Sequence, residues 1–127
     1  MLKRIALATA VLLLCQTGFA QSGAGQGTMV SHNVYFTLKD KAQADKLVAA
    51  CHKYLKVHPG VVFFSAGKRA TELVREVNDK EFDVSLMVVF KTKADHDRYQ
   101  VAEQHKKFIA ENSAGWERVR VFDSFVK

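Results

Sequence analysis

Cysteine and proline are scarce in this 127-residue chain, which contains two cysteines and one proline. Cys15 lies in an apolar run near the N-terminus, and removal of that run would leave only Cys51. A single thiol cannot form an internal disulfide, so the fold must depend on a hydrophobic core, on oligomerisation, or on both. Hydrophobic residues make up 48% of the chain, which is enough for a core. Cys51 falls on an apolar helical stripe, which predicts a structural thiol rather than a reactive one.

The N-terminal segment has the pattern of a secretory signal peptide. Two basic residues precede an apolar run at 5–14, and small residues end at Ala20. This run is shorter than the roughly 20 residues that span a bilayer, so we expect no stable membrane insertion after cleavage. The pattern predicts three segments: a signal peptide at 1–20, a glycine-rich flexible linker at 21–28 and one folded domain at 29–127. The domain would be exported to the periplasm or the extracellular medium after cleavage following Ala20.

The charge pattern argues against a nucleic-acid partner. The formal net charge is +6, but basic residues are interspersed with acidic ones. Blocks of basic residues, or basic residues interleaved with exposed aromatics, are typical of nucleic-acid binding, and the sequence has neither. His52, His58 and His96 have no second ligand at a metal-binding spacing. We therefore predict no metal site and no cofactor.

Hydrophobic periodicity predicts six elements of secondary structure. In chain order they are a strand at 30–38, a helix from Asp40 to the His-Pro-Gly at 58–60, a short strand at 61–64, a strand at 82–90, a helix capped by Thr92 and running to about Glu111, and a strand at 116–126. This order predicts an α+β fold, a ferredoxin-like βαββαβ sandwich with an antiparallel sheet. Its helices cover one face, while the strands carry apolar side chains on both. The second face therefore predicts a homodimer that pairs through the sheet.

Two polar residues with suitable chemistry lie on the second helix. A histidine such as His105 titrates near neutral pH and suits proton abstraction, and the Tyr99 hydroxyl could orient a carbonyl. On a straight helix, residues six apart point about 120° away from each other, so they flank one pocket only if the helix bends. His32 lies with Phe36 on the apolar face of the first strand. A structural interpretation stays open: a buried His32 with a backbone partner, and helix rings that simply pack on the core.

Four segments, in chain order, resemble those of a known family. They are SHNVYFTLKD, HPGVVFFSAG, FDVSLMVVF with the helix after it, and VRVFDSF, and together they span Met29 to Val126. The chain resembles the stress-responsive dimeric α/β-barrel (Dabb) family. The resemblance implies a dimer in which two sheets close into a barrel-like assembly, a dimeric α/β barrel.

The resemblance extends to members of the olivetolic acid cyclase type, in which a tyrosine and a histidine six residues apart act in an aldol cyclisation. It implies Tyr99 and His105 as catalytic residues, and His32 with Phe36 as ligand-binding residues. Those members have a His-Pro pair that breaks the helix before the histidine, whereas this chain has Ala102 and Glu103. We therefore expect the helix to continue and to present His105 at a different angle.

Three functions remain open at this point. The first is an exported homodimer that binds a small, largely apolar organic molecule between sheet and helices, with cofactor-independent chemistry by His105 and Tyr99. The second is a non-enzymatic structural or stress-response protein. The third, a weaker alternative, is a haem-binding or monooxygenase-like barrel, for which His105 would be the axial histidine.

Overall fold

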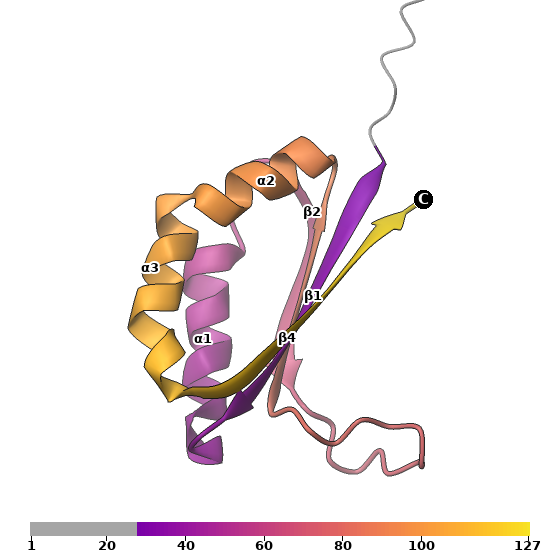
Figure 1. Ribbon diagram of the computed structural model, residues 1–127, viewed down its shortest axis with the longest axis vertical. Helices are drawn as coiled ribbons and strands as arrows, with labels where there is room; N and C mark the ends of the chain where they lie inside the picture. Colours follow the sequence, from indigo (N-terminus) through magenta and orange to yellow (C-terminus); the bar gives the residue numbers. More distant parts are fainter. Residues whose placement is uncertain (1–27) are drawn as a thin grey trace, which may run out of the picture.

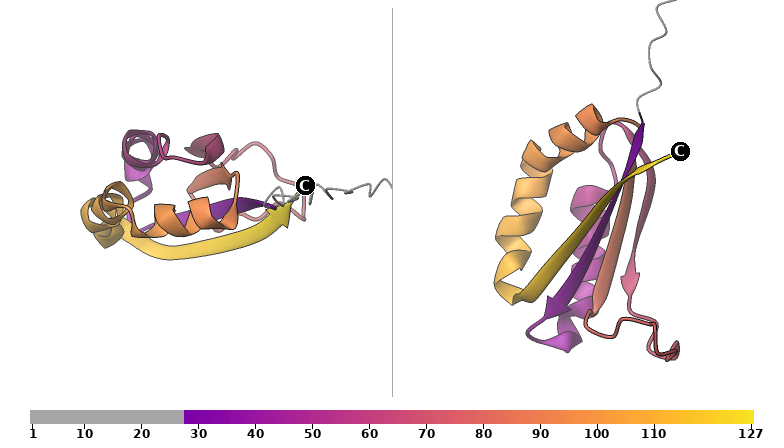
Figure 2. Two further views of the ribbon diagram at one scale, coloured as in Figure 1. Left: turned by 90° about the horizontal axis from the view of Figure 1, so that it is seen from above. Right: turned by 45° about the vertical axis from the view of Figure 1, so that its right-hand side comes forward.

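The structure, a computed structural model, describes residues 28–127. The predicted signal peptide and residues 21–27 of the predicted linker lie outside this range. A four-stranded antiparallel sheet, in the order β2-β3-β1-β4, carries the helices on one face (Figures 1 and 2). The elements in chain order are β1 (Met29–Leu38), the 3₁₀ helix η1 (Lys41–Gln43), α1 (Ala44–Leu55), β2 (Val61–Lys68), β3 (Val84–Phe90), α2 (Lys93–Val101), α3 (Glu103–Asn112), the 3₁₀ helix η2 (Ser113–Gly115) and β4 (Trp116–Val126). This confirms the predicted ferredoxin-like βαββαβ fold.

The core lies between the sheet and the helices because β1 and β3 turn every second side chain toward them. The register pairs Val34 with Leu86 and Phe36 with Val84, so inward-facing residues of the two strands pack side by side. From α1, the fully buried Cys51 packs against this layer. Burial raises the pKa of its thiol to about 12, in line with the predicted structural role.

The opposite face of the sheet is uncovered within the described residues. Phe63, Met87 and Phe122 point away from the helices and are 51%, 40% and 54% exposed. The loop between β2 and β3 bends toward this side (Figure 1), and together with Tyr35 and Phe122 it lines a hollow of about 630 Å³. Large apolar side chains grouped on one exposed face are a common feature of interaction surfaces.

Two strand boundaries differ from the prediction. β2 continues to Lys68 instead of ending after its two phenylalanines, because residues 65–67 pair with β3. β3 begins at Val84, so Phe82 lies outside it. The ring of Phe82 packs edge-on against Tyr35, with centroids 5.0 Å apart, and lines the hollow on the uncovered face instead of joining the core.

The second predicted helix is broken into α2 and α3. Ala102, between them, has φ −66° and ψ 142°, an extended conformation. The expectation that the helix continues here for lack of a proline is therefore wrong. The break redirects the chain, so α2 crosses the end of the sheet and α3 runs beside α1 (Figure 1), with Phe108 in the core. None of the helices in residues 28–127 is long and apolar enough to cross a membrane.

Gly60, in the turn before β2, should not tolerate a side chain. Its φ of +86° lies in the left-handed region, and a Cβ there would overlap the side chain of Asp95. We expect Gly60→Ala to lower the free energy of unfolding by at least about 1–2 kcal/mol from the backbone alone. Gly67→Ala is the matched control, because nothing lies within 4 Å of a Cβ at that position. Urea unfolding followed by circular dichroism measures both, and equal midpoints would contradict this explanation.

Candidate functional site

One cavity, of about 200 Å³, lies between the sheet and the helices and is lined by all four residues singled out in the sequence. His32 and Phe36 reach it from β1, Tyr99 from α2 and His105 from α3. Most of its other walls are aliphatic and aromatic side chains from α1, α3, β3 and β4. The structure thus brings the four residues together in an apolar setting with few polar groups, as is usual for small-molecule sites.

Tyr99 is the most deeply enclosed polar residue of this cavity, with 1% of its surface exposed. Its ring centroid lies 4.6 Å from that of His105, 5.5 Å from that of His58 and 4.9 Å from that of Phe90. Its hydroxyl has no hydrogen-bond partner among residues 28–127. Burial raises the pKa of Tyr99, so the phenol stays protonated. Tyr99 is therefore a hydrogen-bond donor without an acceptor.

His105 is held in one tautomer by the helix break. A helix end leaves backbone carbonyls without intrahelical donors, and the carbonyl oxygen of Gln100 lies 3.1 Å from Nδ1 of His105. A carbonyl can only accept, so Nδ1 carries the proton and Nε2 keeps a lone pair. Burial lowers the pKa of His105 and outweighs the opposing effect of this hydrogen bond. At neutral pH, Nε2 can therefore act as a proton acceptor.

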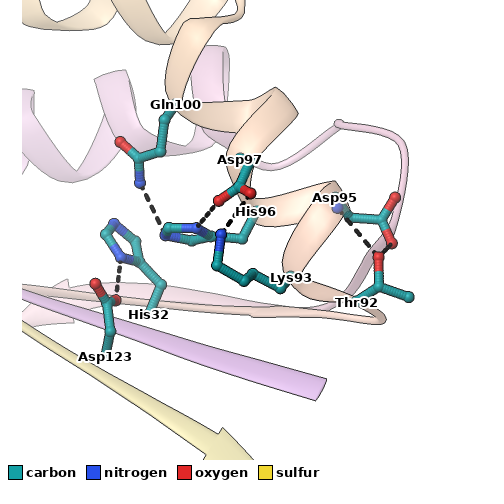
Figure 3. Close-up of polar contacts among 8 residues, drawn as sticks. All are labelled: His32, Thr92, Lys93, Asp95, His96, Asp97, Gln100 and Asp123. Carbon is teal, nitrogen blue, oxygen red and sulfur yellow. Dashed lines mark hydrogen bonds and ion pairs between the residues drawn. The ribbon is translucent and has the colours of Figure 1, made fainter. Parts of the chain in front are cut away.

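His32 has a carboxylate partner that sequence reasoning did not identify. His32 and Asp123 lie directly opposite each other on β1 and β4, and Nδ1 of His32 is 2.6 Å from Oδ1 of Asp123 (Figure 3). His32 is 5% exposed, and burial lowers its pKa more than the carboxylate raises it. Nδ1 of His32 thus hydrogen-bonds to a side chain, whereas the structural interpretation from the sequence assumed a backbone partner. The signal that pairs these residues is the register between the first and last strands, which neither strand reveals alone.

His96 completes a second group of ligating side chains beside the cavity. One ring nitrogen each of His32 and His96 and one carboxylate oxygen of Asp123 lie within 4.8 Å of one another. Spacing along the sequence does not reveal this group, because the three residues come from three different elements and meet only in the fold. Two imidazoles and a carboxylate are suitable ligands for a divalent transition metal. The group is therefore a candidate metal centre created by the fold.

A family model described as the stress responsive A/B barrel domain matches residues 30–126, which is nearly the whole described domain. The chain belongs to the stress-responsive A/B barrel (Dabb) family. This confirms the family resemblance carried by the four sequence segments. No curated protein matches the chain.

Solved structures with the same fold share little sequence with this Dabb protein. A dimeric ferredoxin-like protein of unknown function from Thermobifida fusca is 14% identical, with a TM-score of 0.66 over 80% of this chain and 93% of that chain. A Dabb family protein from Mesorhizobium loti is 19% identical, with a TM-score of 0.64 over 79% and 98% of the two chains. A hydroxynitrile lyase from Passiflora edulis is 19% identical, with a TM-score of 0.63 over 79% and 94%. At these identities the likeness shows the fold alone.

The low pKa of His105 predicts that acid destabilises the fold. In the unfolded chain this pKa returns to 6.5, so between the two pKa values the unfolded state binds more protons than the folded state. The stability contributed by the neutral ring is complete above pH 6.5 and is lost as the pH falls toward the folded pKa. We expect the Tm to fall between about pH 7.5 and about pH 5.5.

His105→Asn is the matched variant for this measurement. The amide nitrogen of asparagine can take the place of Nδ1 and donate to Gln100, but it does not titrate. The variant should therefore show a weaker pH dependence of Tm than the wild-type protein. Superimposable pH profiles would contradict a buried, neutral His105.

Proposed function

We propose that this protein is a homodimer that binds a small, largely apolar organic molecule in the cavity, and that His105 and Tyr99 perform cofactor-independent acid–base chemistry on it. The observation that carries the proposal is the unpartnered, protonated hydroxyl of Tyr99, buried beside a neutral histidine. A buried donor without a partner costs a protein about 1–3 kcal/mol, and a ligand oxygen would satisfy it. A purely structural tyrosine would normally have found a partner within the protein.

The groups around the cavity favour a compact ligand with a carbonyl oxygen. Besides Tyr99, the indole nitrogen of Trp116 is buried without a hydrogen-bond partner among residues 28–127, and Trp116 also lines the cavity. The described residues that line it include no lysine, arginine, aspartate or glutamate, so a neutral ligand fits better than an ion. The volume of about 200 Å³ suits a single-ring compound, because an apolar cavity of about 150 Å³ can hold benzene.

This arrangement supports proton transfer at the carbon next to that carbonyl. Tyr99 would donate a hydrogen bond to the carbonyl oxygen, while Nε2 of His105 removes the proton from the adjacent carbon. The C–H bonding pair then forms a C=C bond, and the oxygen becomes an enolate stabilised by Tyr99. The enolate carbon can attack a second carbonyl, as in an aldol reaction, with His105 returning the proton to the new alkoxide. The resemblance to members of the olivetolic acid cyclase type implies the same two residues as catalytic.

Tyr99→Phe tests whether the Tyr99 hydroxyl contributes to ligand binding or to the stability of the fold. It removes only the hydroxyl, so ligand affinity should fall roughly three- to tenfold, the worth of one hydrogen bond. The ligand-free variant should be at least as stable as the wild type, because the hydroxyl has no partner to lose. A thermal-shift screen of aromatic acids, polyketide-like compounds and haem identifies a ligand. Calorimetry then measures the affinity of the wild type and of Tyr99→Phe for that ligand.

His105→Asn tests the proposed base with the same ligand. This variant should retain ligand binding and lose turnover by about 10²–10⁴.

Other outcomes of that screen would favour the other functions. No shift with any compound, together with a Tyr99→Phe variant that unfolds like a core deletion, would favour a structural or stress-response role. A shift with haem alone, abolished in His105→Asn, would favour a haem protein. Binding and turnover unchanged in both variants would refute the assignment of Tyr99 and His105.

The uncovered face of the sheet supports the homodimer. It presents Phe63, Met87 and Phe122 to solvent, next to the hollow under the β2–β3 loop. A second copy of the protein carries the same exposed apolar side chains, and two-fold symmetry lets each copy cover those of the other. The structurally similar protein from Thermobifida fusca is dimeric.

Phe122→Glu should shift the protein toward the monomer. The change places a charge within the proposed interface, where burial would be costly. Val57→Glu is the matched control, because Val57 is 89% exposed in the loop after α1, on the helical side of the molecule. Light scattering at micromolar concentration should find a wild-type dimer and a Val57→Glu dimer. A folded wild-type monomer at that concentration would overturn the proposed dimer.

A further inference from the structure

Three ligating side chains converge beside the cavity, where His32 faces Asp123 (Figure 3). The antiparallel register places these two residues opposite each other, and His96 extends over them from α2. The ring centroids of the two histidines are 5.3 Å apart. The start of α2 positions His96, because the hydroxyl of Thr92 accepts a hydrogen bond from the backbone N–H of Asp95 and fixes the first turn.

We propose that His32, His96 and Asp123 bind one divalent transition-metal ion, with zinc as the ion whose preferences they match. Their ligating atoms already lie within 4.8 Å of one another. Zinc bonds of about 2.0–2.2 Å bring ligand atoms to about 3.3 Å apart in a tetrahedral site, so a modest contraction around His96 completes the set. Three protein ligands leave one position open for water. The site uses neither Tyr99 nor His105, so it goes beyond the function proposed above.

The hydrogen-bonded pair of His32 and Asp123 must open slightly to admit the ion. Their Nδ1 and Oδ1 atoms are 2.6 Å apart and would separate by less than about 1 Å, with the ring proton moving to the other nitrogen. The side chain of Asp123 is 47% exposed, which leaves room for this movement. The amide nitrogen of Gln100, 3.1 Å from Nε2 of His96, would give way to the ion.

The surroundings of the three residues suit a metal site. Nδ1 of His96 lies 3.4 Å from a carboxylate oxygen of Asp97, which can hold the Nδ1 proton and leave Nε2 for the ion. The Lys93 ammonium pairs with Asp97 at 2.6 Å, so its positive charge is offset. His96 and Asp123 line an open hollow of about 290 Å³, which gives the ion a route from solvent.

Zinc titration of the untagged chain tests the site. After dialysis against a chelator, calorimetry with Zn²⁺ should show one ion bound per chain with a micromolar or lower Kd. The visible absorption of bound Co²⁺ should report a nitrogen- and oxygen-ligated ion. His96→Ala and Asp123→Asn should each weaken binding roughly tenfold or more. His52→Ala is the matched control, because this exposed histidine lies outside the group and its loss should change nothing.

Both test variants keep the buried His32 in place, and circular dichroism checks that each one folds. If one variant does not fold, the other variant still tests the site, because each removes one proposed metal ligand and leaves the remaining two in place. A Kd for zinc weaker than about 1 mM would overturn the proposal. Wild-type affinity in a folded His96→Ala protein, or an equal loss in His52→Ala, would overturn it as well. None of these outcomes bears on ligand binding by Tyr99, which is measured separately.

Discussion

The hydrogen bond from Nδ1 of His105 to the carbonyl of Gln100 holds the break between α2 and α3. It pairs a carbonyl that the end of α2 would otherwise leave without a donor. The turn at this point lets α3 run beside α1, buries Phe108 and places the ring of His105 4.6 Å from that of Tyr99. On an unbroken helix these two side chains would point about 120° apart. This interaction thus fixes the tautomer of the candidate base and, together with the docking of α3 on α1, the packing of the last helix and the lining of the cavity.

The fold follows from alternation of side chains, which is why it could be predicted. In β1 a shift of one residue would expose the apolar set that includes Val34 and Phe36, so only one orientation of the strand is stable. Where the alternation of apolar and polar side chains is weak, the predicted ends of the strands are wrong. Ser65, Ala66 and Gly67 have little strand preference of their own, and they extend β2 because β3 supplies their hydrogen-bonding partners. The ends of strands and helices depend on neighbouring elements, which the local sequence pattern does not contain.

The same limit applies to the site. His32 could be placed on the inner face by alternation, and the resemblance pointed to Tyr99 and His105, yet Asp123 became visible only through the register of β1 with β4. The break at Ala102 has no local signal, since alanine is the best helix former. It forms because docking of α3 on α1 and the bond to the Gln100 carbonyl stabilise the bent chain more than one further helical turn would.

His32 links the cavity to the candidate metal centre. It lines the cavity with Tyr99 and bonds to Asp123, which does not line it. Burial is the main cause of the lowered pKa of His105, and a charge on His32, whenever that ring is protonated, lowers this pKa further. An ion held by His32 would act in the same direction, making His105 a weaker base but keeping it neutral in more acidic solution. The carboxylate of Asp123 offsets part of either charge. The cavity and the candidate metal centre therefore share one histidine, His32.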